Sequence, residues 1–210
     1  MLTCAVTDRV RFSGEHPGRQ VALLDQATRL AAAGVNFVQL REKDLPAADL
    51  AELARELLAT LRAHSPAPKL LINVRADIAL AVAADGVHLT SAPGSLTPSQ
   101  IRTLYASAGL PEPVVSISCH TLADVAHARA AAPSFILFGP VFEKVIAAPD
   151  SHSNETRIAE GSGLNLLHLA CATAAPIPVL ALGGITEENT SACLAAGAAG
   201  IAAIRMFLDL

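Results

Sequence analysis

Two stretches of the sequence carry residues suited to binding an anion. In the first, the cationic residues Arg41 and Lys43 follow a short apolar run that ends near Gln39. In the second, Gly183-Gly184 stands between an apolar run and a helical pattern. Glycines at such a junction let a phosphate approach backbone N–H groups, because no Cβ stands in the way. Both stretches therefore indicate a site for a phosphorylated ligand.

Each stretch also has a simpler interpretation. The glycine pair is equally consistent with a tight turn, and residues 41–43 are consistent with a charged segment exposed to water. One spacing favours the ligand site. Gln39 and Arg41 lie two residues apart, so their side chains point to the same side if the strand continues.

The elements that must position these residues alternate along the chain. Short apolar runs predict strands, and patterns of helical period predict helices. The predicted strands are residues 2–7, 36–40, 70–74, 87–89, 114–118, 135–138, 179–182 and 200–204. The predicted helices are residues 19–33, 46–63, 77–84, 97–108, 121–131, 164–173 and 186–197.

This alternation predicts an α/β fold, the (β/α)8 TIM barrel, with a truncated eighth helix because the chain stops at Leu210. A doubly wound open sheet is the alternative, but no GxGxxG motif follows the first strand. We expect a single domain over residues 1–210. The polar segment 143–163 shows no periodicity, so we expect a long loop there and consider it a candidate substrate loop.

Composition excludes several classes of partner. The net charge is -4 and no basic run is present, which argues against a nucleic-acid partner. Charged residues or glycines interrupt every apolar stretch before it reaches membrane-spanning length, so no membrane partner is expected. The four cysteines are scattered without a CxxC pair, and the N-terminus lacks a signal-peptide pattern. Both features predict reduced thiols and a cytoplasmic location.

Barrel sites lie just beyond the carboxyl ends of the strands, and cations dominate at those positions in this sequence. They are Arg41, Lys43, Arg75, Lys144 and Arg205. A mouth rich in cations on an acidic chain again predicts an anionic ligand, most simply a phosphate.

An ordered set of motifs resembles thiamine-phosphate synthase and its TenI-type relatives. The motifs are Gln39–Lys43, Ile72-Asn73, Ala84–Leu89, Ser118 before His120-Thr121, Gly139–Phe142 and Leu182–Ile185. The resemblance runs from about Leu2 to Phe207. It implies the (β/α)8 barrel that the alternation of elements also predicts.

The resemblance implies a transferase of thiamine biosynthesis. Such an enzyme couples hydroxymethylpyrimidine diphosphate to thiazole phosphate and releases pyrophosphate. The catalytic group implied by position is Arg41, Lys43 and Ser118, with the two cations binding pyrophosphate. Gln39 and Asn73 are implied to bind the pyrimidine substrate, and Lys144 stands where the family has a loop lysine. Gly183, Gly184, Ile204 and Arg205 are implied to bind the thiazole phosphate.

The sequence departs from the family at the metal site. Typical members hold Mg²⁺ with two aspartates, and the matching positions here are Val74 and Pro93. Neither side chain offers the hard oxygen ligand that Mg²⁺ needs. We therefore expect no protein ligands for the metal. Either Mg²⁺ arrives with the pyrophosphate, or the coupling activity is lost.

Three other functions stay open. The first is a TenI-like thiazole tautomerase, although the general-base histidine of that subfamily falls at Pro140. The second is a non-catalytic barrel that binds thiazole phosphate or thiamine phosphate. The third is a sugar-phosphate isomerase, for which Glu143 is the candidate base. All three share small phosphorylated ligands as partners. We also expect a homodimer, because the short segment after Phe207 leaves the first and last barrel elements poorly covered.

Overall fold

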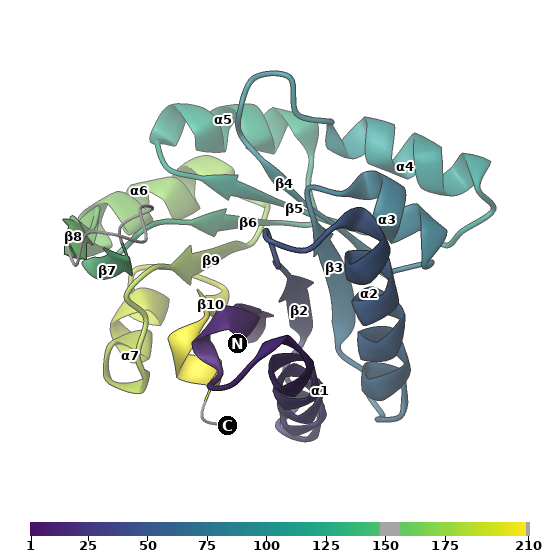
Figure 1. Ribbon diagram of the computed structural model, residues 1–210. Helices are drawn as coiled ribbons and strands as arrows, with labels where there is room; N and C mark the ends of the chain where they lie inside the picture. Colours follow the sequence, from purple (N-terminus) through teal and green to yellow (C-terminus); the bar gives the residue numbers. More distant parts are fainter. Residues whose placement is uncertain (148–155, 209–210) are drawn as a thin grey trace.

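Eight parallel strands close into a barrel in the computed structural model, which describes residues 1–147 and 156–208. The order around the barrel is β1-β10-β9-β6-β5-β4-β3-β2 (Figure 1). The strands are β1 (Leu2–Val6), β2 (Phe37–Leu40), β3 (Lys69–Asn73), β4 (Gly86–Thr90), β5 (Val114–Cys119), β6 (Phe135–Phe138), β9 (Val179–Leu182) and β10 (Gly200–Ala203). The predicted TIM barrel is therefore confirmed, and the alternative of an open sheet is wrong.

Helices cover the outside of the barrel (Figure 1). They are α1 (His16–Ala32), α2 (Ala47–Arg62), α3 (Ala76–Ala81), α4 (Pro98–Ser107), α5 (Leu122–Ala131), α6 (Gly163–Ala174) and α7 (Glu187–Ala195). Three of them begin at a threonine that forms a capping box with the third helical residue, namely Thr97, Thr121 and Thr186. Where an eighth helix would follow β10, the structure describes only the 3-10 turn η2 (Arg205–Phe207).

The barrel interior is filled at the end where the strands begin. Phe37 is the first residue of β2 and Phe135 the first residue of β6, and their ring centroids lie 4.7 Å apart. Further inward-facing residues, among them Cys4, Leu71 and Leu180, pack into the same interior cluster. Because this end is filled, a ligand cavity must open at the carboxyl ends of the strands.

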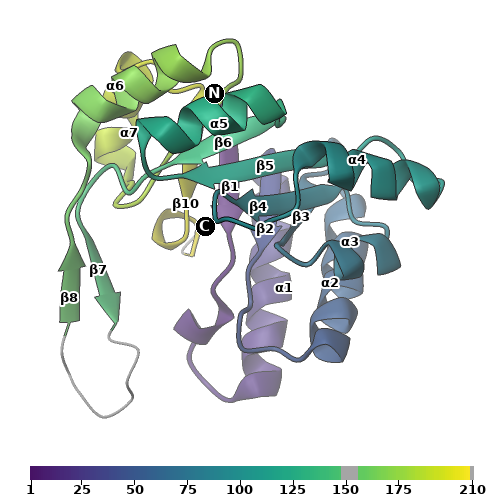
Figure 2. The same ribbon diagram turned by 90° about the horizontal axis from the view of Figure 1, so that it is seen from above.

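The segment after β6 contains a hairpin that the sequence analysis did not predict. β7 (Lys144–Ala147) pairs with β8 (Thr156–Ala159) as an antiparallel ribbon that extends away from the barrel (Figure 2). Each strand has only four residues, too few to show a clear alternating pattern in the sequence. Backbone hydrogen bonds close its base, since the N–H groups of Ser162 and Gly163 donate to the carbonyls of Pro140 and Val141.

Candidate active site

A cavity of about 610 Å³ opens where the barrel strands end. The residues that line it at the end of β2 and just after it are Gln39, Arg41 and Lys43. Strands β3 and β5 contribute Asn73 and Ser118. The turns after β9 and β10 contribute Gly183, Gly184, Ile204 and Arg205. These are all but one of the site residues predicted from the sequence. The remaining residue, Lys144, begins β7, and its side chain lies outside the described part of the structure.

Alternation along β2 explains why Gln39 and Arg41 face the cavity together. Phe37, two residues before Gln39, fills the barrel interior, whereas Val38 and Leu40 pack outward against the helices. The side-chain amide of Gln39 is buried, and its Nε2 has no hydrogen-bond partner among the described residues. An unpaired buried donor in a cavity wall is costly unless a ligand accepts its hydrogen. Gln39 is therefore a ligand-binding candidate.

The charge of the cavity wall is strongly positive. Among the described residues, four cationic side chains line it, Arg11, Arg41, Lys43 and Arg205, against one carboxylate, that of Glu143. Such an imbalance favours an anionic ligand. Arg75, one of the five strand-end cations of the sequence, is not among the lining residues and instead makes two hydrogen bonds to Asp77 at the start of α3.

Gly183 and Gly184 both adopt positive φ, at +95° and +67°. This conformation turns the chain from β9 toward the capped start of α7. Among the described residues, the carbonyls of both glycines accept hydrogen bonds, from Phe142 N–H and the Asn189 amide, but neither N–H group donates one. The two N–H groups are therefore available for an anion such as phosphate.

His88 is a buried residue of the cavity wall and lies between two serines of β5. Its Nδ1 is 2.8 Å from Ser116 Oγ and its Nε2 is 2.8 Å from Ser118 Oγ. Burial, with a smaller contribution from the charge of Arg41, lowers the pKa of His88 to about 3. The imidazole is therefore neutral near pH 7, with one nitrogen donating and the other accepting. The histidine is a satisfied core residue, and it also fixes the Ser118 hydroxyl at the cavity.

This histidine predicts a pH dependence of stability. Its pKa is about 3 in the fold and about 6.5 unfolded, so the unfolded chain binds the proton first as the pH falls. Protonation of His88 in the unfolded chain should therefore lower the free energy of unfolding by roughly 1.4 kcal/mol for each pH unit between about 6.5 and about 3. Urea unfolding at several pH values measures the slope. His88→Gln should flatten it, whereas His127→Gln, on the exposed face of α5, should not; equal slopes in all three proteins would contradict the assignment.

The cavity does not fit a Mg²⁺ ion held by the protein. Val74 lines it without an oxygen ligand, and Pro93 is exposed and not among the lining residues. Within residues 1–147 and 156–208, no group of three His, Cys, Asp or Glu side chains is placed to hold a metal. Glu143 is the sole carboxylate on the cavity wall in the described residues, and one carboxylate with hydroxyl and amide neighbours is a poor magnesium site.

Val74 also has an unusual backbone. The sequence pattern predicts strand to residue 74, but β3 ends at Asn73 and Val74 has a φ of 52°. A β-branched residue is strained in this left-handed region, whereas asparagine tolerates it. Val74→Asn should therefore raise the free energy of unfolding by about 1 kcal/mol, measured by urea denaturation. Val21→Asn, at another exposed valine in α1, should change the free energy of unfolding little, and a similar gain there would contradict the strain.

Sequence reasoning missed Arg11 as a cavity residue. It lies in the 3-10 turn η1 (Arg9–Arg11), where its Nε donates to Asp8 over 2.6 Å. No periodic pattern marks a cation at the end of such a turn.

The adjacent pair Cys119 and His120 behaves as strand alternation predicts, because Cys119 is buried among the outer core while His120 lines the cavity.

Comparisons with known proteins agree with this geometry. The sequence profile of the family described as "Thiamine monophosphate synthase" matches residues 4–207. A protein of Aquifex aeolicus provisionally named thiamine-phosphate synthase 2 is 38% identical over 98% of this chain and 96% of its own length. The thiamine-phosphate synthase of Roseiflexus sp. is 32% identical over 97% of this chain and 76% of its own length.

The fold comparison leads to the same family. A solved structure named thiamine phosphate pyrophosphorylase, from Pyrococcus furiosus, superposes with a TM-score of 0.73 at 25% identity. The superposition covers 97% of this chain and 85% of that one. With a family profile over nearly the whole chain, the chain belongs to the thiamine monophosphate synthase and TenI family.

Proposed function

We propose that this chain is a thiamine-phosphate synthase, a transferase that joins hydroxymethylpyrimidine diphosphate to thiazole phosphate. The observation that carries the proposal is a single cavity whose wall contains both anion-binding features, the cations of residues 41–43 and the glycine pair at 183–184. Two phosphorylated substrates bound there meet with their reacting atoms between them. Holding two reactants in line supplies much of the rate enhancement in a bimolecular reaction.

In the proposed reaction, the bond between the pyrimidine methylene carbon and the diphosphate oxygen breaks, and pyrophosphate leaves with the electron pair. The ring nitrogen of the thiazole then donates its lone pair to that carbon. Arg41 and Lys43 stabilise the negative charge on the departing pyrophosphate. Ser118, held by His88, donates or accepts a hydrogen bond beside the leaving group.

The remaining residues bind and orient the two substrates. Gln39 offers its unpaired Nε2–H to a ring nitrogen of the pyrimidine. Asn73, at the end of the neighbouring strand β3, lines the same cavity. The N–H groups after β9 and the turn at Ile204 and Arg205 hold the thiazole phosphate. Lys144 and the segment 143–163 are proposed as the substrate loop of a single barrel domain.

Magnesium enters this proposal only as a companion of the diphosphate. The family implies the metal, but the described cavity lacks the two carboxylates, so no catalytic step is assigned to a protein-held ion. The cations Arg11, Arg41 and Lys43 supply positive charge on the protein side instead.

The test is pyrophosphate release with both substrates and Mg²⁺ present, measured against reactions that omit one substrate. Release that requires both substrates, with formation of thiamine phosphate, supports the synthase. Binding of thiazole phosphate without turnover favours a non-catalytic barrel. Isomerisation of the thiazole without the pyrimidine favours a tautomerase. Either of the last two results would overturn the proposal.

Cellular context and assembly follow as further proposals. Among the described residues, no helix is both long and apolar enough to cross a bilayer. All four cysteines are free thiols, consistent with a reducing compartment such as the cytoplasm. We also propose a homodimer, and a monomeric mass by light scattering at micromolar concentration would refute it.

A further inference from the structure

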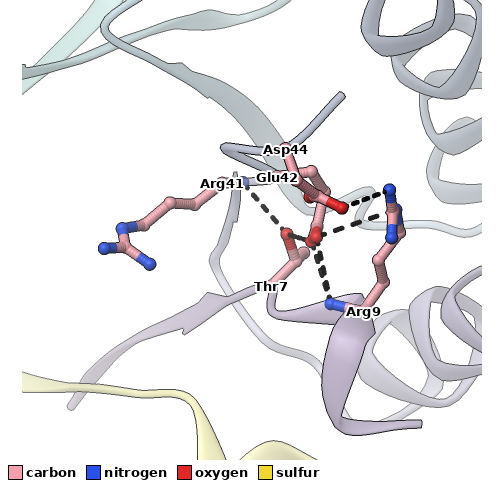
Figure 3. Close-up of polar contacts among 5 residues, drawn as sticks. All are labelled: Thr7, Arg9, Arg41, Glu42 and Asp44. Atoms are coloured by element: carbon pink, nitrogen blue, oxygen red, sulfur yellow. Dashed lines mark hydrogen bonds and ion pairs between the residues drawn. The ribbon is translucent and has the colours of Figure 1, made fainter. Parts of the chain in front are cut away.

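Glu42 is a buried carboxylate directly beside the proposed pyrophosphate site. It follows Arg41 in the chain, but it is 5% exposed and points away from the cavity. Figure 3 shows the Arg41 side chain extending to one side while Glu42 turns back between Thr7 and Arg9. Strand-like alternation continues past the end of β2 and places the two side chains on opposite sides.

The hydrogen bonds at Glu42 have a fixed direction. A carboxylate only accepts, so the single hydroxyl proton of Thr7 is donated to Glu42 Oε1, over 2.5 Å. The Thr7 oxygen then has only lone pairs left, and it accepts the backbone N–H of Arg41 at 3.0 Å. A directed chain therefore runs from Arg41 N–H through the Thr7 hydroxyl to the Glu42 carboxylate (Figure 3).

Burial raises the pKa of Glu42 above its usual range, while the hydrogen bonds from Thr7 and Arg9 and the charge of Arg9 oppose that rise. Arg9 contacts the carboxylate through both its backbone and its side chain. Its backbone N–H donates to both carboxylate oxygens, at 3.2 and 3.1 Å. The guanidinium Nε lies 4.0 Å from Oε2, and the same side chain donates to Asp44 over 2.8 Å. Glu42 thereby connects the turn after β2 to the turn after β1. A buried carboxylate with these partners holds the two turns in place, because the loss of any one partner leaves a buried polar group without a hydrogen bond.

We propose that Glu42 is a positioning residue for the anion site, setting the backbone of Arg41 through Thr7 so that the guanidinium faces the cavity. It touches no substrate and acts only through Arg41. The identity of the anion as pyrophosphate rests on the proposed function, but the positioning itself does not. The proposal therefore predicts that Glu42 affects anion affinity only while Arg41 is present.

The experiment is a double-mutant cycle, with inorganic pyrophosphate titrated into the full chain by calorimetry. Glu42→Gln should weaken pyrophosphate binding about tenfold. In an Arg41→Ala background, the same change should alter affinity less than about twofold, because the residue through which it acts is gone. The matched control is Asp44→Asn, the other carboxylate bound to Arg9, which is half exposed and should change affinity less than about twofold.

A second measurement needs no ligand. Amide hydrogen exchange at Arg41 should be faster in Glu42→Gln and in Thr7→Val, and Thr7→Ser should restore the wild-type rate because it keeps the hydroxyl. If Glu42→Gln does not fold, the comparison of Thr7→Val with Thr7→Ser still tests the proposal. A tenfold weakening that persists without Arg41, or unchanged exchange at Arg41 in Thr7→Val, would overturn the proposal.

The outcome also separates this proposal from the proposed function. A protein that binds pyrophosphate through Arg41 and Glu42 but never couples the two substrates would refute the synthase and keep the positioning role. A chain that couples the two substrates but whose pyrophosphate affinity is unchanged by Glu42→Gln would support the synthase and refute the positioning role.

Discussion

Arg41→Ala is expected to lower pyrophosphate release by about 10² to 10³ fold. The guanidinium lines the cavity at the end of β2, and the proposed chemistry develops negative charge on a departing pyrophosphate. Removing one preorganised donor from such a site costs about this factor in other enzymes, because nothing replaces it at the moment of reaction. Initial rates with both substrates saturating measure the effect on turnover.

The matched control is Arg75→Ala. Arg75 lies just past the end of the neighbouring strand β3 and is also a strand-end cation in the sequence. It is not among the cavity-lining residues, and its side chain pairs with Asp77 at a partly exposed position. We expect turnover to change by less than about threefold there. Equal losses in the two variants would mean that net charge, not the position of Arg41, governs the reaction.

Gly184→Ala should strongly destabilise the fold at the cavity wall. Its φ is +67°, and an added Cβ would lie 2.6 Å from Phe142 Cβ and 2.7 Å from Glu143 O. The left-handed conformation alone costs an alanine about 1 to 2 kcal/mol. The overlap adds about 1 to 3 kcal/mol, because backbone must move to relieve it. Binding of thiazole phosphate should weaken as well, since the displaced turn carries the unpaired N–H groups.

Comparison with Gly109→Ala separates the cost of the steric overlap from the cost of the left-handed conformation. Gly109 has nearly the same φ, +68°, but an added Cβ would meet nothing within 4 Å. This variant should lose only the conformational cost and keep full affinity for thiazole phosphate. Thermal and urea unfolding of the two variants, with calorimetric binding, gives the difference. A Gly184→Ala protein as stable as Gly109→Ala would show that the crowded turn relaxes without cost.

The parts of the fold that were predictable rest on local pattern. The runs that became β2 and β9 are short and apolar, and Thr186 and Glu187 mark the start of α7 as a cap and an acidic first turn should. The period of two along β2 also correctly placed Gln39 and Arg41 on one side. Because parallel strands end at the same face, these local signals were enough to gather most of the predicted site residues around one cavity.

The features that were missed depend on contacts between distant segments. Thr7 and Glu42 are 35 positions apart, and neither residue type by itself indicates a buried hydrogen bond between them. Arg11 reaches the cavity from an irregular turn, and the β7–β8 ribbon is stabilised by cross-strand pairing of two very short strands. No local period records such pairings, so sequence pattern alone does not reveal them.

The left-handed backbone at Val74 has an evolutionary consequence. Asparagine and aspartate are the side-chain-bearing residues that occupy this conformation most readily, so an aspartate at position 74 would fit the existing turn. A GTT or GTC valine codon becomes an aspartate codon by one nucleotide change, whereas GTA or GTG becomes a glutamate codon. Placing a carboxylate at this position would therefore require no change in the backbone conformation of residue 74.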